Sequence, residues 1–184
     1  MVELARAKGV PAELADVQQL PFDDDAFDLV LAAWVLFHLP DLDRGLAEIV
    51  RVLRPGGELI AVTNGPEHLH ELWGLIEEPG YQLSFDGANG RELLERHFDR
   101  VRQIRLEATV TFHDHEPIRR YVAASMQRSH LADRVPPLAR PLTATCSWCV
   151  FVATTREASD ASAHGPLAIT REASEATVTS ITDG

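Results

Sequence analysis

The chain has 184 residues, enough for one domain with a sizeable core, and 45% of them are hydrophobic, as in an ordinary soluble globular protein. A formal net charge of −11 argues against a nucleic-acid backbone or an anionic membrane as the partner. No apolar run approaches membrane-spanning length, and the N-terminus lacks the long apolar region of a signal peptide. These features predict a cytoplasmic protein that binds neither nucleic acid nor membrane.

The N-terminal part predicts a short helix and, further on, a buried strand. Met1–Lys8 is typical of a helix that Gly9 ends. Phe27–Trp34 (FDLVLAAW) is apolar at nearly every position, which favours a parallel strand buried on both faces.

A second helix and a second strand follow. One apolar stripe at helical spacing contains Leu42, Leu46, Ile49, Val50 and Leu53. Asp41 is placed to cap this helix, and Arg51 and Arg54 lie near its end, where the helix dipole favours cations. The run 55–57 (PGG) is expected to stop the helix before a buried strand at Leu59–Thr63. Together with Phe27–Trp34, these elements predict a βαβ unit.

The remaining pattern predicts three more helices and two more strands. The helices are expected at Glu67–Glu77, Asn89–Phe98 and Glu116–Met126. Val101–Phe112 alternates apolar and polar residues, which indicates a half-exposed antiparallel strand near the sheet edge, and Thr143–Ala153 is the last strand. From Thr155 the composition is small and polar without aromatics, so we expect a domain over 1–154 and a disordered tail over 155–184.

The cysteine and histidine pairs do not predict a metal centre. Cys146 and Cys149 lie three apart on a predicted strand, so their side chains point to opposite faces and are interpreted as small core residues. His113 and His115 share a face if the strand continues, but no third ligand is evident nearby. We therefore expect no metal site.

Four motifs carry a family resemblance. D-V-x-x-L-P-F from Asp16, F-D-L-V from Phe27, L-F-H-L-P-D from Leu36 and E-I-x-R-V-L-R-P-G-G from Glu48 follow one another within about fifty residues. In this order they resemble the class I S-adenosylmethionine-dependent methyltransferases, in the small-molecule branch that includes the ubiquinone-type enzymes. The resemblance implies an α/β fold, a Rossmann-like sheet of strand order 3-2-1-4-5-7-6 with helices on both faces.

The resemblance also implies that the chain is N-terminally shortened. Ala12–Ala15 would be the third strand, and the first two strands and the glycine-rich loop of the family are absent before it. The third strand would then have no neighbour, and the fourth would have an unpaired edge. We therefore expect doubtful activity and self-association through that edge.

The resemblance implies a set of site residues for S-adenosylmethionine. Asp16 would accept a hydrogen bond from the adenine amino group, with the Val17 backbone N–H meeting a ring nitrogen, and Ala33 and Trp34 would lie beside the methionine part. His38 occupies the family's histidine position and would contact substrate or cofactor, or act as a base. The alternatives are that Asp16 caps a turn and that His38 is a local hydrogen-bond partner.

The function implied is methyl transfer from S-adenosylmethionine to a small-molecule acceptor. This direct displacement needs alignment and exclusion of water rather than a recognisable triad, so the acceptor atom stays open. The alternative is a non-catalytic remnant that binds a partner or a second copy of itself. A nucleotide-binding oxidoreductase is disfavoured, because the chain has no G-x-G-x-x-G after a first strand.

Overall fold

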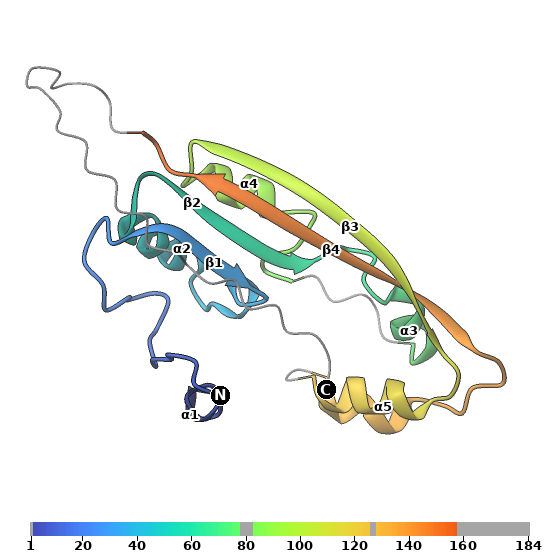
Figure 1. Cartoon of the computed structure of the whole chain (residues 1–184). Coiled ribbons are helices and arrows are strands. Elements are labelled where there is room, and N and C mark those ends of the chain that lie inside the picture. The colour runs from blue at the N-terminus through green and yellow to red at the C-terminus, as the bar shows by residue number, and fades with distance from the viewer. Residues whose placement is uncertain (1, 78–82, 126–127, 158–184) are drawn as a thin grey trace, which may run out of the picture.

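The computed structural model describes residues 2–77, 83–125 and 128–157. Within these ranges the chain forms one sheet of four strands in the order β1-β2-β4-β3 (Figure 1). The strands are β1 (Phe27–Ala33), β2 (Leu53–Asn64), β3 (Arg100–Phe112) and β4 (Leu142–Thr154). β1 and β2 pair in parallel, whereas β2–β4 and β3–β4 pair antiparallel. With β1 as the family's fourth strand, this order is the expected 4-5-7-6, which confirms the predicted fold class.

Short helices connect the strands. They are α1 (Val2–Ala7), α2 (Leu42–Val52), α3 (His70–Leu75), α4 (Gly90–Glu95) and α5 (Glu116–Ala123), with 3₁₀ turns η1 (Leu36–His38) and η2 (Ser129–Arg134). The predicted helices are confirmed, although α3, α4 and α5 are shorter than expected, and Met126, the predicted end of the last helix, lies outside the described residues. Asp41 caps α2 as predicted, because its carboxylate accepts a hydrogen bond from the Arg44 backbone N–H at 3.0 Å.

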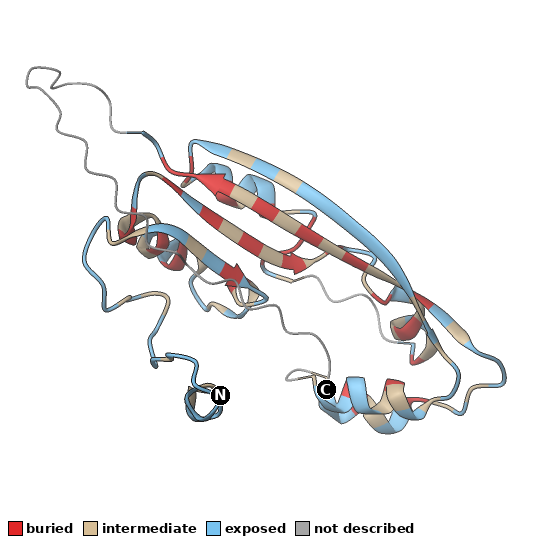
Figure 2. Cartoon of the chain, viewed as in Figure 1, coloured by how far each residue is buried: buried red, intermediate tan, exposed pale blue. Residues whose placement is uncertain are grey.

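The main core lies between one face of the sheet and the helices α2 and α4. Alternate residues of β2 and β4 point into it, so that Leu59, Ala61, Phe151 and Ala153 are fully buried (Figure 2). Phe151 contacts Phe85 edge-on, with 5.5 Å between ring centroids. The core on this face therefore holds β1, α2 and β2 together.

A second core covers the opposite face of the sheet, where β3 ends and β4 begins. Buried residues of α3, α5 and η2, namely Leu72, Ile118, Val122 and Leu131, pack there around Ala144 of β4. Helices thus lie on both faces of the sheet, as predicted. The face that carries the second core is not covered by described residues along β1, where Leu29 and Leu31 are 51% and 65% exposed.

Three local predictions were wrong. Ala12–Ala15 forms no strand, since no described strand lies beside it to supply ladder hydrogen bonds. β1 is largely exposed rather than buried on both faces, because one edge and one face have no cover within the described residues. α2 ends at Val52, and Leu53 begins β2, pairing with Phe27, so the strand includes the PGG run.

The predicted tail lies outside the described residues from 158 onward. Thr155, placed in that tail by composition, is instead buried, and its hydroxyl donates to the Arg54 carbonyl oxygen at 2.8 Å. The last described residues therefore continue the contacts of β4 with the start of β2.

The segment between α1 and β1 is held by hydrogen bonds to α2. The Leu20 backbone N–H donates to the Glu48 carboxylate at 2.9 Å, and Arg51 donates to the carbonyl oxygens of Leu20 and Phe22 and to the Asp24 carboxylate. Arg51 also pairs with Glu48 at 2.9 Å. These bonds fix a segment that has no strand partner among the described residues.

Replacing Phe151 by alanine is expected to lower the free energy of unfolding by about 3–5 kcal/mol, because it leaves a cavity in the main core. The matched control is Ile104→Ala, since Ile104 lies on β3 and is 37% exposed, and it should cost about 1 kcal/mol or less. Urea denaturation monitored by circular dichroism measures both. Equal losses for the two variants would contradict this assignment of the core.

The Glu48 contacts predict a pH-dependent contribution to stability. Hydrogen bonds from Arg51, and then from the Leu20 backbone, lower the pKa of Glu48 to about 2, against an ordinary value of 4.5. The stabilisation is therefore complete above about pH 4.5 and is lost as the pH falls toward 2. In urea denaturation, the advantage of the wild type over Glu48→Gln should shrink across this interval. A difference that stays constant with pH would show that the carboxylate charge does not hold the segment.

Candidate functional site

The candidate site lies where the parallel strands β1 and β2 end. In sheets of this kind, ligands bind outside the carboxyl ends of the parallel strands. Ala33 ends β1, Trp34 follows it, and His38 belongs to η1 immediately beyond. Asp16 and Val17 reach the neighbourhood from a distant part of the chain, through the segment that lies along α2.

Asp16 and Val17 form a tight turn. One Asp16 carboxylate oxygen accepts hydrogen bonds from the backbone N–H and the side chain of Gln18, at 2.9 and 3.3 Å. Asp16 therefore caps a turn, as the alternative interpretation held. The other carboxylate oxygen and the Val17 backbone N–H make no hydrogen bond to the described residues. Both stay available to a ligand.

Gln18 fixes this turn to the start of α2. Its side-chain oxygen accepts from the Asp41 backbone N–H, and its carbonyl oxygen accepts from the Arg44 side chain, both at 3.0 Å. Gly45 permits the close packing, because a Cβ there would lie 2.5 Å from the Leu39 side chain and 3.7 Å from that of Val17. The turn is thus brought beside the end of η1.

Trp34 has an unusual backbone. Its φ is 51°, a left-handed conformation that bulky residues rarely adopt. Its backbone N–H still continues the sheet by donating to the Val62 carbonyl oxygen at 2.9 Å. Its indole N–H donates to the Asn64 side-chain oxygen at 3.2 Å, and 47% of the residue is exposed.

His38 is exposed, and its ring makes no hydrogen bond to the described residues. The ring lies 4.4 Å from that of Phe37, centroid to centroid. Among the described residues, no group orients the imidazole by a hydrogen bond.

Sequence reasoning missed three residues at this end of the sheet. Asn64 ends β2 and pairs across the sheet with Trp148 of β4. The Trp148 ring lies 5.9 Å from that of His68, which precedes α3. A polar residue directly after the apolar run at Leu59–Thr63 is the signal that identifies Asn64. The other two become neighbours only through the antiparallel pairing of β4.

The described residues contain no group of three or more histidine, cysteine or acidic side chains that would hold a metal ion. No described helix is long and apolar enough to cross a membrane. Cys149 is buried in the main core, and Cys146 packs at the second core on the opposite face, so the interpretation of both as core residues is confirmed.

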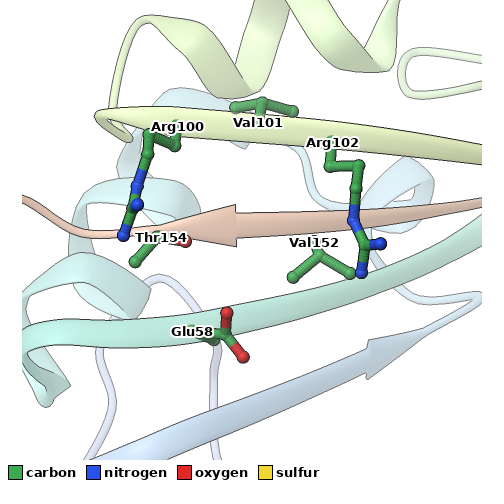
Figure 3. A pocket seen from close by; sticks show the side chains of 6 residues that line it. All are labelled: Glu58, Arg100, Val101, Arg102, Val152 and Thr154. Carbon is green, nitrogen blue, oxygen red and sulfur yellow. The ribbon is translucent and has the colours of Figure 1, made fainter.

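A separate hollow of about 350 Å³ lies at the other end of β2 (Figure 3). Arg100 and Arg102 of β3 reach across β4 toward Glu58 of β2. Because Glu58 pairs with Leu29 near the start of β1, the hollow lies at the amino end of the parallel strands. It is therefore distinct from the candidate site.

Comparison with known proteins agrees with these motifs. The model of a family described as a methyltransferase domain matches residues 1–61. The malonyl-[acyl-carrier protein] O-methyltransferase of Halorhodospira halophila is 44% identical over 68 residues, which are 37% of this chain and 23% of that protein. The ubiquinone/menaquinone biosynthesis C-methyltransferase of Laribacter hongkongensis is 43% identical over 53 residues, 29% of this chain and 22% of that protein. The matches thus span less than a quarter of the length of these curated relatives.

The fold comparison extends over more of the chain. A crystal structure of an S-adenosylmethionine-dependent methyltransferase from Thermotoga maritima matches with a TM-score of 0.54 at 20% identity, covering 85% of this chain and 69% of that one. This likeness concerns the fold, and the segment from Asp16 to the end of β2 adds the family motifs. Residues 1–61 are thus similar to a methyltransferase domain, and the described sheet has the fold of S-adenosylmethionine-dependent methyltransferases.

Proposed function

We propose that the chain acts in methyl transfer from S-adenosylmethionine to a small-molecule acceptor in the cytoplasm. The observation that carries the proposal is the turn at Asp16 and Val17, which α2 fixes beside the carboxyl end of β1. The motif resemblance assigns the adenine to this turn. Bound S-adenosylmethionine supplies an activated methyl group, while the chain's residues position it and the acceptor.

The chemistry of the turn fits an adenine edge. Adenine presents an amino donor next to a ring-nitrogen acceptor, and the turn offers a carboxylate oxygen next to a backbone N–H. Within the described residues, neither the second oxygen of Asp16 nor the N–H of Val17 has another partner. Gln18 engages only the first oxygen of Asp16, so capping the turn and binding adenine are compatible.

The remaining site residues are assigned by their positions. Ala33 is small, and it permits close approach of the methionine part to the end of β1. The exposed imidazole of His38 makes no hydrogen bond to the described residues. It is therefore our candidate for the group that contacts the acceptor or takes its proton.

The proposal is tested by titrating the ¹⁵N-labelled chain with S-adenosylhomocysteine and following the backbone amide signals by NMR, which detects weak binding. The Val17 amide should shift, and Asp16→Ala should weaken binding by about 1–3 kcal/mol, because a buried donor loses its acceptor. The control is Asp23→Ala, which removes an exposed carboxylate from the same segment and should leave affinity unchanged. Equal effects of the two variants, or an unshifted Val17 amide, would remove the turn from the site.

A second candidate function is self-association as a non-catalytic domain. The exposed side chains of Leu29 and Leu31 on β1, whose outer edge is unpaired within the described residues, favour it. β3 is the other edge strand, but it carries four charged side chains, Arg100, Arg102, Arg105 and Glu107, whereas β1 carries only Asp28. Charges protect an edge, so we propose that β1 pairs with β1 of a second copy.

Light scattering after size exclusion tests this second candidate. The chain should elute as a dimer of 20.3 kDa protomers, and Leu31→Lys should shift it to the monomer by placing a charge in the contact. Leu106→Lys changes a leucine of β3 that is 48% exposed and should leave the dimer intact. A wild-type chain that stays monomeric at every concentration would refute self-association and would leave the first proposal untouched.

A further inference from the structure

One face of the sheet carries an apolar surface that no described element covers. Alternate residues of a strand share a face, and directly paired residues of neighbouring strands share it too. By the register of the four strands, the exposed leucines of β1 and the exposed apolar residues of β3 lie on the same face (Figure 2). Half-buried residues of β2 and β4 lie between them. We call this surface the open face, and its main residues are Leu29, Leu31, Ile60, Ile104, Leu106 and Val152.

Packing within the described residues does not account for the open face. Its four residues on the outer strands β1 and β3 are between 37% and 65% exposed. None of its six main residues belongs to the main core or to the second core. Single apolar residues are normal on a protein surface, whereas a contiguous apolar patch marks an interaction site. The open face therefore has the properties of a docking surface.

Two arginines border the open face at the amino end of the parallel strands. Arg100 and Arg102 extend from β3 across β4 over the hollow of about 350 Å³ (Figure 3). Both residues are exposed, and Arg102 pairs with no acidic side chain among the described residues. Glu58 is the acidic residue that lines the hollow, so two positive charges face one negative charge. This balance favours an occupant that carries carboxylates.

The last described residues lie beside these arginines. The Thr155 backbone N–H donates to the Gly57 carbonyl oxygen at 3.0 Å, and the Gly56 backbone N–H donates to the Arg156 carbonyl oxygen at 3.3 Å. These bonds continue the course of β4 along the start of β2. The Glu157 carboxylate then lies 3.7 Å from the Arg100 guanidinium. The chain therefore passes the arginine end of the open face immediately before residue 158.

The composition of residues 158–184 matches the chemistry of this surface. The segment has four acidic residues against one arginine, namely Asp160, Glu172, Glu175 and Asp183 against Arg171. Its large apolar residues are Leu167, Ile169, Val178 and Ile181. Alone, these few apolar side chains bury too little surface to offset the entropy of ordering the segment. An apolar face that is already formed supplies the partner that the segment itself lacks.

The length of the segment allows the contact. Leu167 follows Glu157 by ten residues, which span up to about 33 Å when extended. Leu106 follows Arg100 by six residues on β3, a distance of about 20 Å along a strand. The apolar residues from Leu167 onward can therefore reach every part of the open face.

We propose that residues 158–184 dock on the open face of their own chain. Leu167 and Ile169 pack on its apolar side chains, and acidic residues of the segment pair with Arg100 and Arg102. The expectation of a disordered tail then applies only to the segment when it is separated from the sheet. The outer edge of β1 stays free in this arrangement, so docking is compatible with the β1 pairing proposed above. The inference depends on neither of the two candidate functions.

Nuclear Overhauser effects between methyl groups test the docking in the full chain. The leucine, isoleucine and valine methyl groups are labelled, and the signals of the segment are assigned with Leu167→Ala and Ile169→Val. In the wild type, these methyl groups should show Overhauser effects to those of Leu31, Ile104 or Leu106. Effects that arise only between differently labelled chains in a mixed sample would identify a second copy as the occupant and overturn the proposal.

Charge reversal at the arginines tests the polar part of the contact. The variant Arg100→Glu/Arg102→Glu should lose these Overhauser effects and bind several-fold more Nile red, a neutral dye that detects exposed apolar surface. The control is Arg105→Glu, which changes an exposed arginine on the opposite face of β3 and should alter neither readout. Equal behaviour of the two variants would overturn the proposal.

A substitution in the segment gives the same test without altering the sheet. Leu167→Asp should abolish the Overhauser effects and raise Nile red binding, because a carboxylate does not pack on an apolar face. Ser162→Asp adds the same charge at a polar position of the segment and should leave the docking intact. A wild-type segment without Overhauser effects to the open face, or dye binding that Leu167→Asp leaves unchanged, would refute the docking.

Discussion

Hydrogen bonds from α2 hold the segment that carries the candidate cofactor turn, and Arg51 and Glu48 supply most of them. The segment before β1 runs along α2 in the same direction as the helix, from Gln18 beside the cap of α2 to Asp24 beside Arg51 near its end. It forms no helix and no ladder between the described strands, so its course depends on these side-chain bonds. α2 begins beyond the carboxyl end of β1, and Gln18 lies at the start of α2. Asp16 therefore lies near that end of β1.

Trp34, Asn64 and Trp148 lie at the same end of the sheet, but a different kind of interaction brings them together. There the backbone pairing of β2 with β4 brings Trp148 to Asn64, and the strained backbone of Trp34 turns its indole toward them. Side-chain hydrogen bonds to α2 therefore position the turn at Asp16 and Val17, whereas the register of β2 against β4 positions Asn64 and Trp148. A substitution in α2 should therefore displace the turn more than Asn64 and Trp148, because only the turn is hydrogen-bonded to α2.

The sequence predicts the strands, the helix cap at Asp41 and the sheet order well, because these depend on apolar periodicity and on ordered motifs. It predicts the wrong structure for Ala12–Ala15, because a strand needs a pairing partner that composition does not reveal. It also places the end of α2 too late, since Leu53 fits the helical stripe but pairs with Phe27 instead. Local pattern does not decide between these two uses of the same leucine.

The candidate site is predictable only in part for a similar reason. Motifs locate Asp16, Val17 and His38, but the partners of Trp34 depend on the register of strands far apart in the chain. His68 lies in no strand, and only the Ser147 backbone bond reveals its tautomer. Residues that meet through long-range pairing are the ones that sequence reasoning missed.

A crystal structure of the chain with S-adenosylhomocysteine tests the central claim most directly. Our account predicts the adenine amino group within about 3 Å of the second Asp16 carboxylate oxygen, and a ring nitrogen at the same distance from the Val17 backbone N–H. The segment along α2 should keep its bonds to Glu48 and Arg51. Adenine bound elsewhere, for example in the hollow between Arg100 and Glu58, would contradict it.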